Sequence, residues 1–162
     1  MKVSDGYWLS KPGYNVSYAT QIYDIEADET SVTAYVTQHW IENRGMTLGG
    51  PMLTVRFTST LENSIKVSIE HFSGTLNKSP SFELHEETDF KPVIKITSDG
   101  HYELISGKTS VKVGKLGCEW ENSFWYDGKL LTQNGWRTTS YIEEDAWLNS
   151  KRLEYETGVR TI

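Results

Sequence analysis

Apolar and polar residues alternate with a period of two along most of this chain, and a helical period is hard to find. Successive side chains of a strand point to opposite faces, so each alternating run can bury one face and expose the other. The dipeptides Asp99-Gly100, Asp127-Gly128 and Asn134-Gly135 separate such runs. They favour hairpin turns because both residues tolerate a positive φ. The pattern predicts an all-β chain folded as an antiparallel β-sandwich.

The chain has 162 residues, of which 37% are hydrophobic, and this suits one domain with a folded core. Residues 1–142 are predicted to form the β-sandwich. Residues 143–162 are highly charged and alternate poorly, so a short helix or an irregular tail of the same domain is predicted there. The predicted strands are Gln21–Ala27, Ser31–Thr37, Pro51–Thr60, Ser64–Phe72, Pro92–Ser98, His101–Ser106, Lys108–Val113, Cys118–Tyr126, Lys129–Gln133 and Trp136–Ile142.

Charge and apolar content argue against two classes of partner. The formal net charge is −6 and there is no Lys/Arg cluster, which argues against nucleic acid. No apolar run reaches the roughly 18–20 residues of a membrane helix, and the opening residues lack the apolar segment of a signal peptide. Cys118 is the single cysteine, so no internal disulfide is expected. We therefore expect a cytoplasmic protein that binds neither nucleic acid nor a membrane.

Glu70 and His71 are adjacent at the end of the strand predicted over Ser64–Phe72, and both residue types serve in acid–base catalysis. Adjacent strand residues point to opposite faces. If Val67 and Ile69 face the core, His71 ends that face and Glu70 points outward. The two side chains cannot then act on one substrate atom, and His71 is expected to be a hydrogen-bonded structural residue.

Other candidate chemistry is weaker. A loose set of metal-type side chains lacks the spacing of known zinc motifs; its members are His71, Glu83, His85, Glu86 and Glu87. Cys118 lies in a predicted strand and is expected to be buried, since nothing in the sequence suggests an accessible, reactive thiol. There is neither a Gly-x-Ser-x-Gly elbow nor a phosphate-binding glycine loop. We therefore predict no catalytic, cofactor-binding or metal-binding residue, and no cofactor.

Several segments resemble, in order and spacing, the start of bacterial α-xylosidases and α-glucosidases of glycoside hydrolase family 31. The resemblance covers roughly residues 1–140. It implies a β-sandwich of the galactose-mutarotase-like (supersandwich) type, followed in the family by a (β/α)₈ barrel with two catalytic aspartates. The segments are the opening MKVSDGYWLSKPGYN, PMLTVRF at Pro51–Phe57, IEHFSGTLNKSP at Ile69–Pro80, ELISGKTSVKV at Glu103–Val113 and FWYDGKLLT at Phe124–Thr132.

The resemblance implies a non-catalytic N-terminal domain of an α-xylosidase-like retaining glycosidase. A (β/α)₈ barrel needs about 200 residues or more, so it does not fit in this chain. Thr88-Asp89-Phe90 looks like the family's nucleophile strand, but the expected preceding lysine is absent, so Asp89 is not assigned as a nucleophile. The implied partner is the catalytic barrel, and the isolated chain is expected to be inactive and to self-associate through exposed apolar surface.

Two alternatives remain. In the first, the chain is a free-standing carbohydrate-binding module in which Trp8, Trp40 or Trp147 stacks on sugar rings, although tryptophans in a sandwich more often fill its core. In the second, weaker alternative, the chain has a mutarotase-like activity. That activity needs acid–base residues that converge in a groove, whereas the four histidines are dispersed along the sequence at His39, His71, His85 and His101.

Overall fold

The structure is a computed structural model that describes residues 4–5, 9–71 and 90–145. It contains two compact units: unit 1 consists of Met1–Tyr18 and Ser140–Ile162, and unit 2 consists of Ala19–Thr139. Every pair of strands among the described residues is antiparallel. The two units are described separately below.

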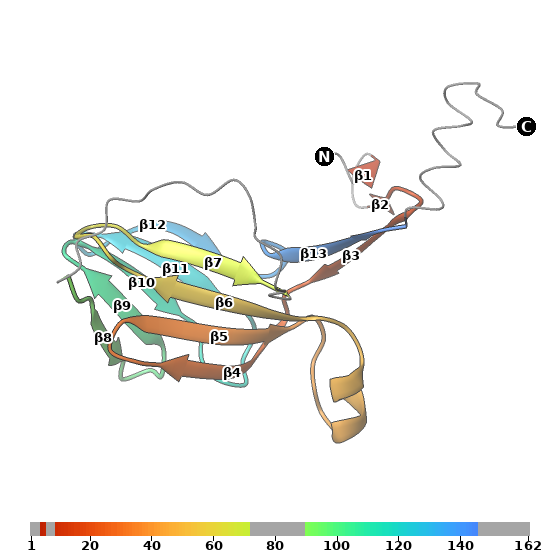
Figure 1. Ribbon diagram of the computed structural model, residues 1–162, viewed down its shortest axis with the longest axis horizontal. Helices are drawn as coiled ribbons and strands as arrows, with labels where there is room; N and C mark the ends of the chain where they lie inside the picture. Colours follow the sequence, from red (N-terminus) through yellow and green to blue (C-terminus); the bar gives the residue numbers. More distant parts are fainter. Residues whose placement is uncertain (1–3, 6–8, 72–89, 146–162) are drawn as a thin grey trace, which may run out of the picture. The chain divides into compact units, whose positions relative to one another are not determined.

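Unit 2 contains two sheets that stack face to face (Figure 1). The four-stranded sheet has the order β4-β5-β6-β7, and the five-stranded sheet has the order β12-β11-β10-β9-β8. The predicted antiparallel β-sandwich is therefore confirmed, while its galactose-mutarotase-like subtype stays a prediction. The strands are β4 (Gln21–Ala27), β5 (Ser31–Thr37), β6 (Met52–Thr58), β7 (Lys66–Glu70), β8 (Val93–Ile96), β9 (Tyr102–Ser106), β10 (Thr109–Val113), β11 (Asn122–Tyr126) and β12 (Lys129–Asn134).

The core lies between the inner faces of these sheets, because alternate residues of each strand point inward. Phe57 and Val55 on β6 are fully buried, and so are Leu104 on β9 and Val111 on β10. Burial of a large apolar side chain contributes about 1.5–3 kcal/mol, so these inward-facing rows are the main source of stability. The other core residues are Ala19, Ile22, Ile25, Val32, Ala34, Val36, Leu53, Val113 and Trp120.

Connections between the sheets close the sandwich on two sides. The Ser59 hydroxyl donates to the Ser106 hydroxyl oxygen at 2.9 Å, and both groups are buried. The segment before β11 pairs with β4: the Ile22 N–H donates to the Cys118 carbonyl at 2.9 Å, and the Trp120 N–H donates to the Thr20 carbonyl at 2.7 Å. The serine bond pairs two buried hydroxyls, and the two backbone bonds give partners to main-chain groups of buried Ile22 and Trp120.

Two of the three predicted hairpin turns are confirmed. Asp99-Gly100 joins β8 to β9, and Asp127-Gly128 joins β11 to β12, with positive φ at Asp127 (48°) and at Gly128 (73°). The predicted Asn134-Gly135 hairpin is wrong, because the next strand pairs with β3 and not with β12. In that connection Arg137 carries the positive φ, at 67°.

Unit 1 combines strands from both ends of the sequence. β1 (Ser4–Asp5) pairs with β2 (Leu9–Ser10), and β3 (Tyr14–Tyr18) pairs with β13 (Ser140–Glu144). The Asn15 amide donates to the Glu143 carboxylate at 3.0 Å beside this ladder. β13 begins four residues after the start predicted for the strand Trp136–Ile142. The division at residue 142 between sandwich and tail stays a prediction.

The predicted core face of β7 needs a correction. Val67 and Ile69 stand opposite the buried residues Phe57 and Val55, so their predicted inward orientation is confirmed. They are nevertheless 40% and 51% exposed. β7 lies at the edge of its sheet, and an edge strand has a neighbour on one side only.

The prediction that Cys118 is buried in a strand is wrong. Cys118 is exposed and lies in a bend that precedes β11. Gly117, with φ +75°, turns the backbone there, and the Cys118 N–H donates to the Lys115 carbonyl at 3.1 Å. The alternation in CEWENSFWY therefore extends beyond the strand itself.

The β4–β5 turn depends on one carboxylate. Asp28 Oδ1 accepts the N–H groups of Thr30 at 2.7 Å and Ser31 at 2.8 Å, and Oδ2 accepts the Ser31 hydroxyl at 2.8 Å. Hydrogen bonds to a carboxylate favour its charged form. These bonds, chiefly the one from the Thr30 N–H, lower the pKa of Asp28 to about 2.

An isoleucine-to-alanine substitution should cost more unfolding free energy at a buried position than at a partly exposed position on an edge strand. We expect Ile22→Ala, at a fully buried site, to lower the free energy of unfolding by about 2–5 kcal/mol. Ile69→Ala should cost only about 1 kcal/mol, because half of that side chain already contacts water. Urea unfolding of both variants measures the difference, and equal losses would contradict the assignment of β7 as a partly exposed edge.

Asp28→Asn should destabilise the chain at neutral pH and have little effect in strong acid. The folded-state pKa of Asp28 is about 2, below the ordinary value of 3.8, so its stabilisation is present above pH 4 and is lost as the pH falls towards 2. The cost at pH 7 should be about 1 kcal/mol, because the exposed turn is screened by solvent. Unfolding curves between pH 7 and pH 2 test this, and a difference that persists unchanged at pH 2 would contradict it.

Candidate functional site

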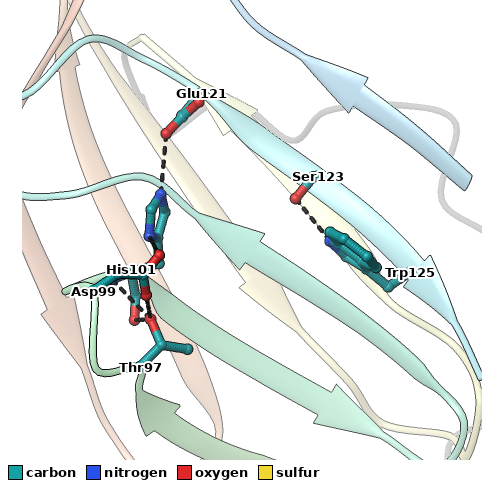
Figure 2. A network of polar contacts seen from close by, with 6 residues as sticks. All are labelled: Thr97, Asp99, His101, Glu121, Ser123 and Trp125. Carbon is teal, nitrogen blue, oxygen red and sulfur yellow. Dashed lines mark hydrogen bonds and ion pairs between the residues drawn. The ribbon is translucent and has the colours of Figure 1, made fainter. Parts of the chain in front are cut away.

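A cluster of charged side chains lies at one end of the five-stranded sheet of unit 2 (Figure 2). β9 and β11 begin at this end, because each is antiparallel to β10 between them. His101 directly precedes β9, and Glu121 directly precedes β11. His101 Nδ1 lies 2.8 Å from Asp99 Oδ2, and His101 Nε2 lies 3.1 Å from Glu121 Oε1. The imidazole thus connects the β8–β9 turn to β11.

Thr97 fixes the position of Asp99 within the β8–β9 turn. Its hydroxyl donates to Asp99 Oδ1, and its hydroxyl oxygen accepts the His101 N–H at 3.0 Å. The hydrogen bond from Thr97, followed by smaller contributions that include the charge of His101, lowers the pKa of Asp99 below its ordinary value. Asp99 is therefore a carboxylate at neutral pH and an acceptor for His101.

A concave surface of about 210 Å³ adjoins this cluster. On its β11 side, Trp125 Nε1 donates to the Ser123 hydroxyl oxygen at 2.9 Å. Lys112 on β10 places its ammonium 4.6 Å from the centre of the Trp125 ring, a cation–π contact. The residues that line this concave surface are Asp99, His101, Lys112, Glu121, Asn122, Ser123, Trp125 and Gln133.

The cluster suits a structural role better than acid–base catalysis. Both nitrogens of His101 face carboxylates, and only the doubly protonated imidazolium can donate to both at once. The imidazole also occupies the space between Asp99 and Glu121. A retaining glycosidase needs its two carboxyl groups about 5–5.5 Å apart on either side of the scissile bond, and an intervening side chain is incompatible with that arrangement.

Glu70 lines a second, shallow groove of about 450 Å³ on the outer face of the four-stranded sheet. In this groove the Tyr35 hydroxyl donates to Glu26 Oε2 at 3.1 Å, which raises the pKa of Tyr35. Arg56 Nη2 donates to the Ser31 hydroxyl oxygen at 3.2 Å. His71 has a different environment, since its Nδ1 lies 3.3 Å from the Met52 carbonyl oxygen. The non-catalytic assignment of the Glu70–His71 pair stays a prediction.

The other predicted candidates are only partly described. Trp40 is 44% exposed, whereas Trp120 is buried in the core. His39 contacts the Met46 carbonyl oxygen, so the three described histidines have different partners. The following candidates lie outside the described residues: Trp8, Glu83, His85, Glu86, Glu87, Asp89 and Trp147.

Within residues 4–5, 9–71 and 90–145, no group of three or more His, Cys, Asp or Glu side chains could hold a metal ion. In the same part of the chain, no helix is long and apolar enough to cross a membrane.

The sequence did not reveal the cluster at Asp99, His101 and Glu121. From the sequence, Asp99-Gly100 is predicted only as a hairpin turn, and Glu121 lies inside the predicted strand Cys118–Tyr126. These residues meet because β9 and β11 are both neighbours of β10. The register of β9 and β11 on the two sides of β10 brings these residues together. The spacing of residues within a single strand does not predict that register.

The sequence of this chain is similar to parts of two known proteins. No protein-family model matches it. Its sequence is 30% identical over 161 residues to alpha-xylosidase XylQ of Lactiplantibacillus pentosus, and the match covers 98% of this chain but 20% of that protein. It is 29% identical over 108 residues to an alpha-xylosidase of Emericella nidulans, covering 67% of this chain and 12% of that protein.

This chain is related to alpha-xylosidases. The resemblance predicted from the sequence segments is therefore confirmed at the level of alpha-xylosidases. The chain spans about a fifth of the length of the L. pentosus protein. It thus corresponds to one part of an alpha-xylosidase-like protein.

Thr97→Val should raise the pKa of Asp99 towards its ordinary value, because it removes the hydrogen bond that contributes most to the lowered pKa. His101→Asn should also raise it, because the charge and the side-chain hydrogen bond of His101 both lower this pKa. The chemical shift of Asp99 Cγ, followed by NMR during acid titration, measures both changes. An Asp99 pKa that stays unchanged in Thr97→Val would contradict the assignment of this hydrogen bond as the main cause.

Proposed function

We propose that this chain is the non-catalytic N-terminal domain of an α-xylosidase-like retaining glycosidase of glycoside hydrolase family 31. Its role is to support a (β/α)₈ catalytic barrel in the full-length protein, called the parent protein below. The parent protein acts on α-linked sugars in the cytoplasm. Its two catalytic carboxyl groups belong to the barrel, and the sandwich described here contributes none.

One observation carries the proposal: almost the whole chain matches an alpha-xylosidase, yet the match spans only a fifth of that protein. The β-sandwich of unit 2 is the second support, because it is the fold expected for the region before the barrel. The cluster around His101 is consistent with this assignment, since its geometry suits a structural connection between strands. In the isolated chain the barrel is absent, so the apolar residues that it would cover stay exposed to water. We expect these residues to promote self-association.

The alternative of a free-standing carbohydrate-binding module is not favoured. It would require a sugar-stacking surface that works without a catalytic domain, whereas the matches are to alpha-xylosidases. Of the candidate stacking residues, which are Trp8, Trp40 or Trp147, the structure describes Trp40. Titration calorimetry with xylo-oligosaccharides should give no heat of binding with the isolated chain, and saturable binding would favour the module instead.

Hydrolysis of a chromogenic α-xyloside tests the proposed function. The isolated chain should be inactive. A chimera in which this chain replaces the matched region of the L. pentosus alpha-xylosidase should hydrolyse the substrate, because the sandwich supports the barrel. The same protein with the matched region deleted should lose at least a hundredfold in rate. Hydrolysis by the isolated chain, abolished by changing one of its own carboxylates, would overturn the proposal.

A further inference from the structure

The connection between β5 and β6, residues 38–51, is an ordered loop that protrudes from one end of unit 2 (Figure 1). It contains the 3₁₀ helix η1 (Arg44–Leu48). Asn43 caps this helix, since its side-chain oxygen accepts the Gly45 N–H at 3.0 Å. The conformation of the loop is thus determined by its own hydrogen bonds.

His39 connects the two arms of the loop. Its Nε2 lies 2.9 Å from the Met46 carbonyl oxygen, and a carbonyl can only accept, so Nε2 carries the proton. Gly50, with φ +83°, lies against the His39 ring, and a Cβ at this position would lie 3.5 Å from that ring. At the base of the loop, the Ile41 N–H donates to the Gln21 side-chain oxygen at 2.8 Å. The loop is therefore anchored to β4 as well as internally braced.

This braced loop exposes large apolar side chains. Leu48, at the end of η1, is 91% exposed, and Trp40 is 44% exposed. Next to the loop, Met52 at the start of β6 and Tyr23 at the β4 bulge are 39% and 44% exposed. Single exposed apolar residues are common on protein surfaces, whereas a group of them marks an interaction site. A rigid loop loses little entropy on binding.

A small cavity lies at the base of the loop. Its volume is about 100 Å³. Two exposed residues of the apolar group, Tyr23 and Met52, form part of its wall. The surface therefore combines a projecting side chain, Leu48, with a recess that could accept one side chain of a partner. The residues that line this cavity are Tyr23, Thr37, Ile41, Thr47, Gly49, Gly50, Pro51 and Met52.

The loop also lies where unit 2 connects to the rest of the polypeptide. The chain enters unit 2 at Ala19 and leaves it at Thr139, and the Ala19 N–H donates to the Thr139 carbonyl at 2.9 Å. The next residue, Thr20, donates its N–H at 2.8 Å to the carbonyl of Thr37, where the loop begins. Any further part of the parent protein is joined to unit 2 through this end.

We propose that the loop of residues 38–51 docks unit 2 onto the catalytic part of the parent protein, with Leu48 and Trp40 as its apolar anchors; this rests on the proposed function. The relative from L. pentosus has about four fifths of its length outside the match, which supplies the partner. That partner presents an apolar recess for Leu48. Because both parts belong to one polypeptide, their effective concentration is high and a modest apolar contact suffices.

The chimera with the L. pentosus alpha-xylosidase provides the test. Leu48→Ser and Trp40→Ser remove the two anchors, and Leu131→Ser is the matched control, since Leu131 is 64% exposed on β12 in the other sheet. We expect the two anchor variants to reduce α-xyloside hydrolysis at least tenfold, and the control to stay within twofold of the unmodified chimera. In scanning calorimetry, the anchor variants should split one unfolding transition into two, because the parts are no longer coupled.

Thermal unfolding of the isolated chain monitors folding. Leu48→Ser and Leu131→Ser should leave its midpoint nearly unchanged, because those side chains are mostly exposed. Trp40→Ser should lower it slightly, because Trp40 is only 44% exposed, and the chain should still unfold cooperatively. If the unmodified chimera is active and the anchor variants match the control in rate and calorimetry, the docking proposal is overturned while the proposed function stands. An inactive unmodified chimera overturns the proposed function and the docking proposal together.

Discussion

The packing of two inner sheet faces against each other is the constraint from which the rest of this structure follows. Residues such as Phe57, Leu104 and Val111 are fully buried because each sheet covers the other. Central strands such as β6 and β10 therefore bury apolar side chains at alternate positions. The outer faces are consequently free to carry polar residues such as Arg56 and Lys112, and the edge strand β7 is free to leave Ile69 half exposed.

The features that could be predicted from the sequence are those set by the alternation of apolar and polar residues and by the residue types in the turns. Sequence reasoning identified the sandwich, most strands, and the turns at Asp99-Gly100 and Asp127-Gly128, because these depend on residues close in sequence. It failed where pairing partners decide the outcome. The Asn134-Gly135 dipeptide favours a hairpin, yet the strand that follows pairs with β3, more than a hundred residues away. Alternation likewise cannot distinguish an edge strand from a central one, so the burial of Ile69 was overestimated.

The candidate site was less predictable than the fold for the same reason. His101, Asp99 and Glu121 come from two connections, and they meet only because β10 lies between β9 and β11. The two-carboxylate environment of His101 is a consequence of that register. A sequence search for catalytic motifs does not detect it, since the three residues have no characteristic spacing. Once the register is known, the geometry favours a connection between strands over catalysis at this position.

The two ends of the sandwich differ in a way that the core does not require. At one end the connections are mostly tight, as at Asp28–Thr30 and Asp127-Gly128. At the other end two described connections are longer, residues 38–51 and 114–121, and the connections at that end expose Leu48, Leu116 and Trp136. Strand alternation places no requirement on residues in such connections, so their apolar character is not explained by the fold. A docking contact of the kind proposed above would account for it, and the chain enters and leaves unit 2 at this same end.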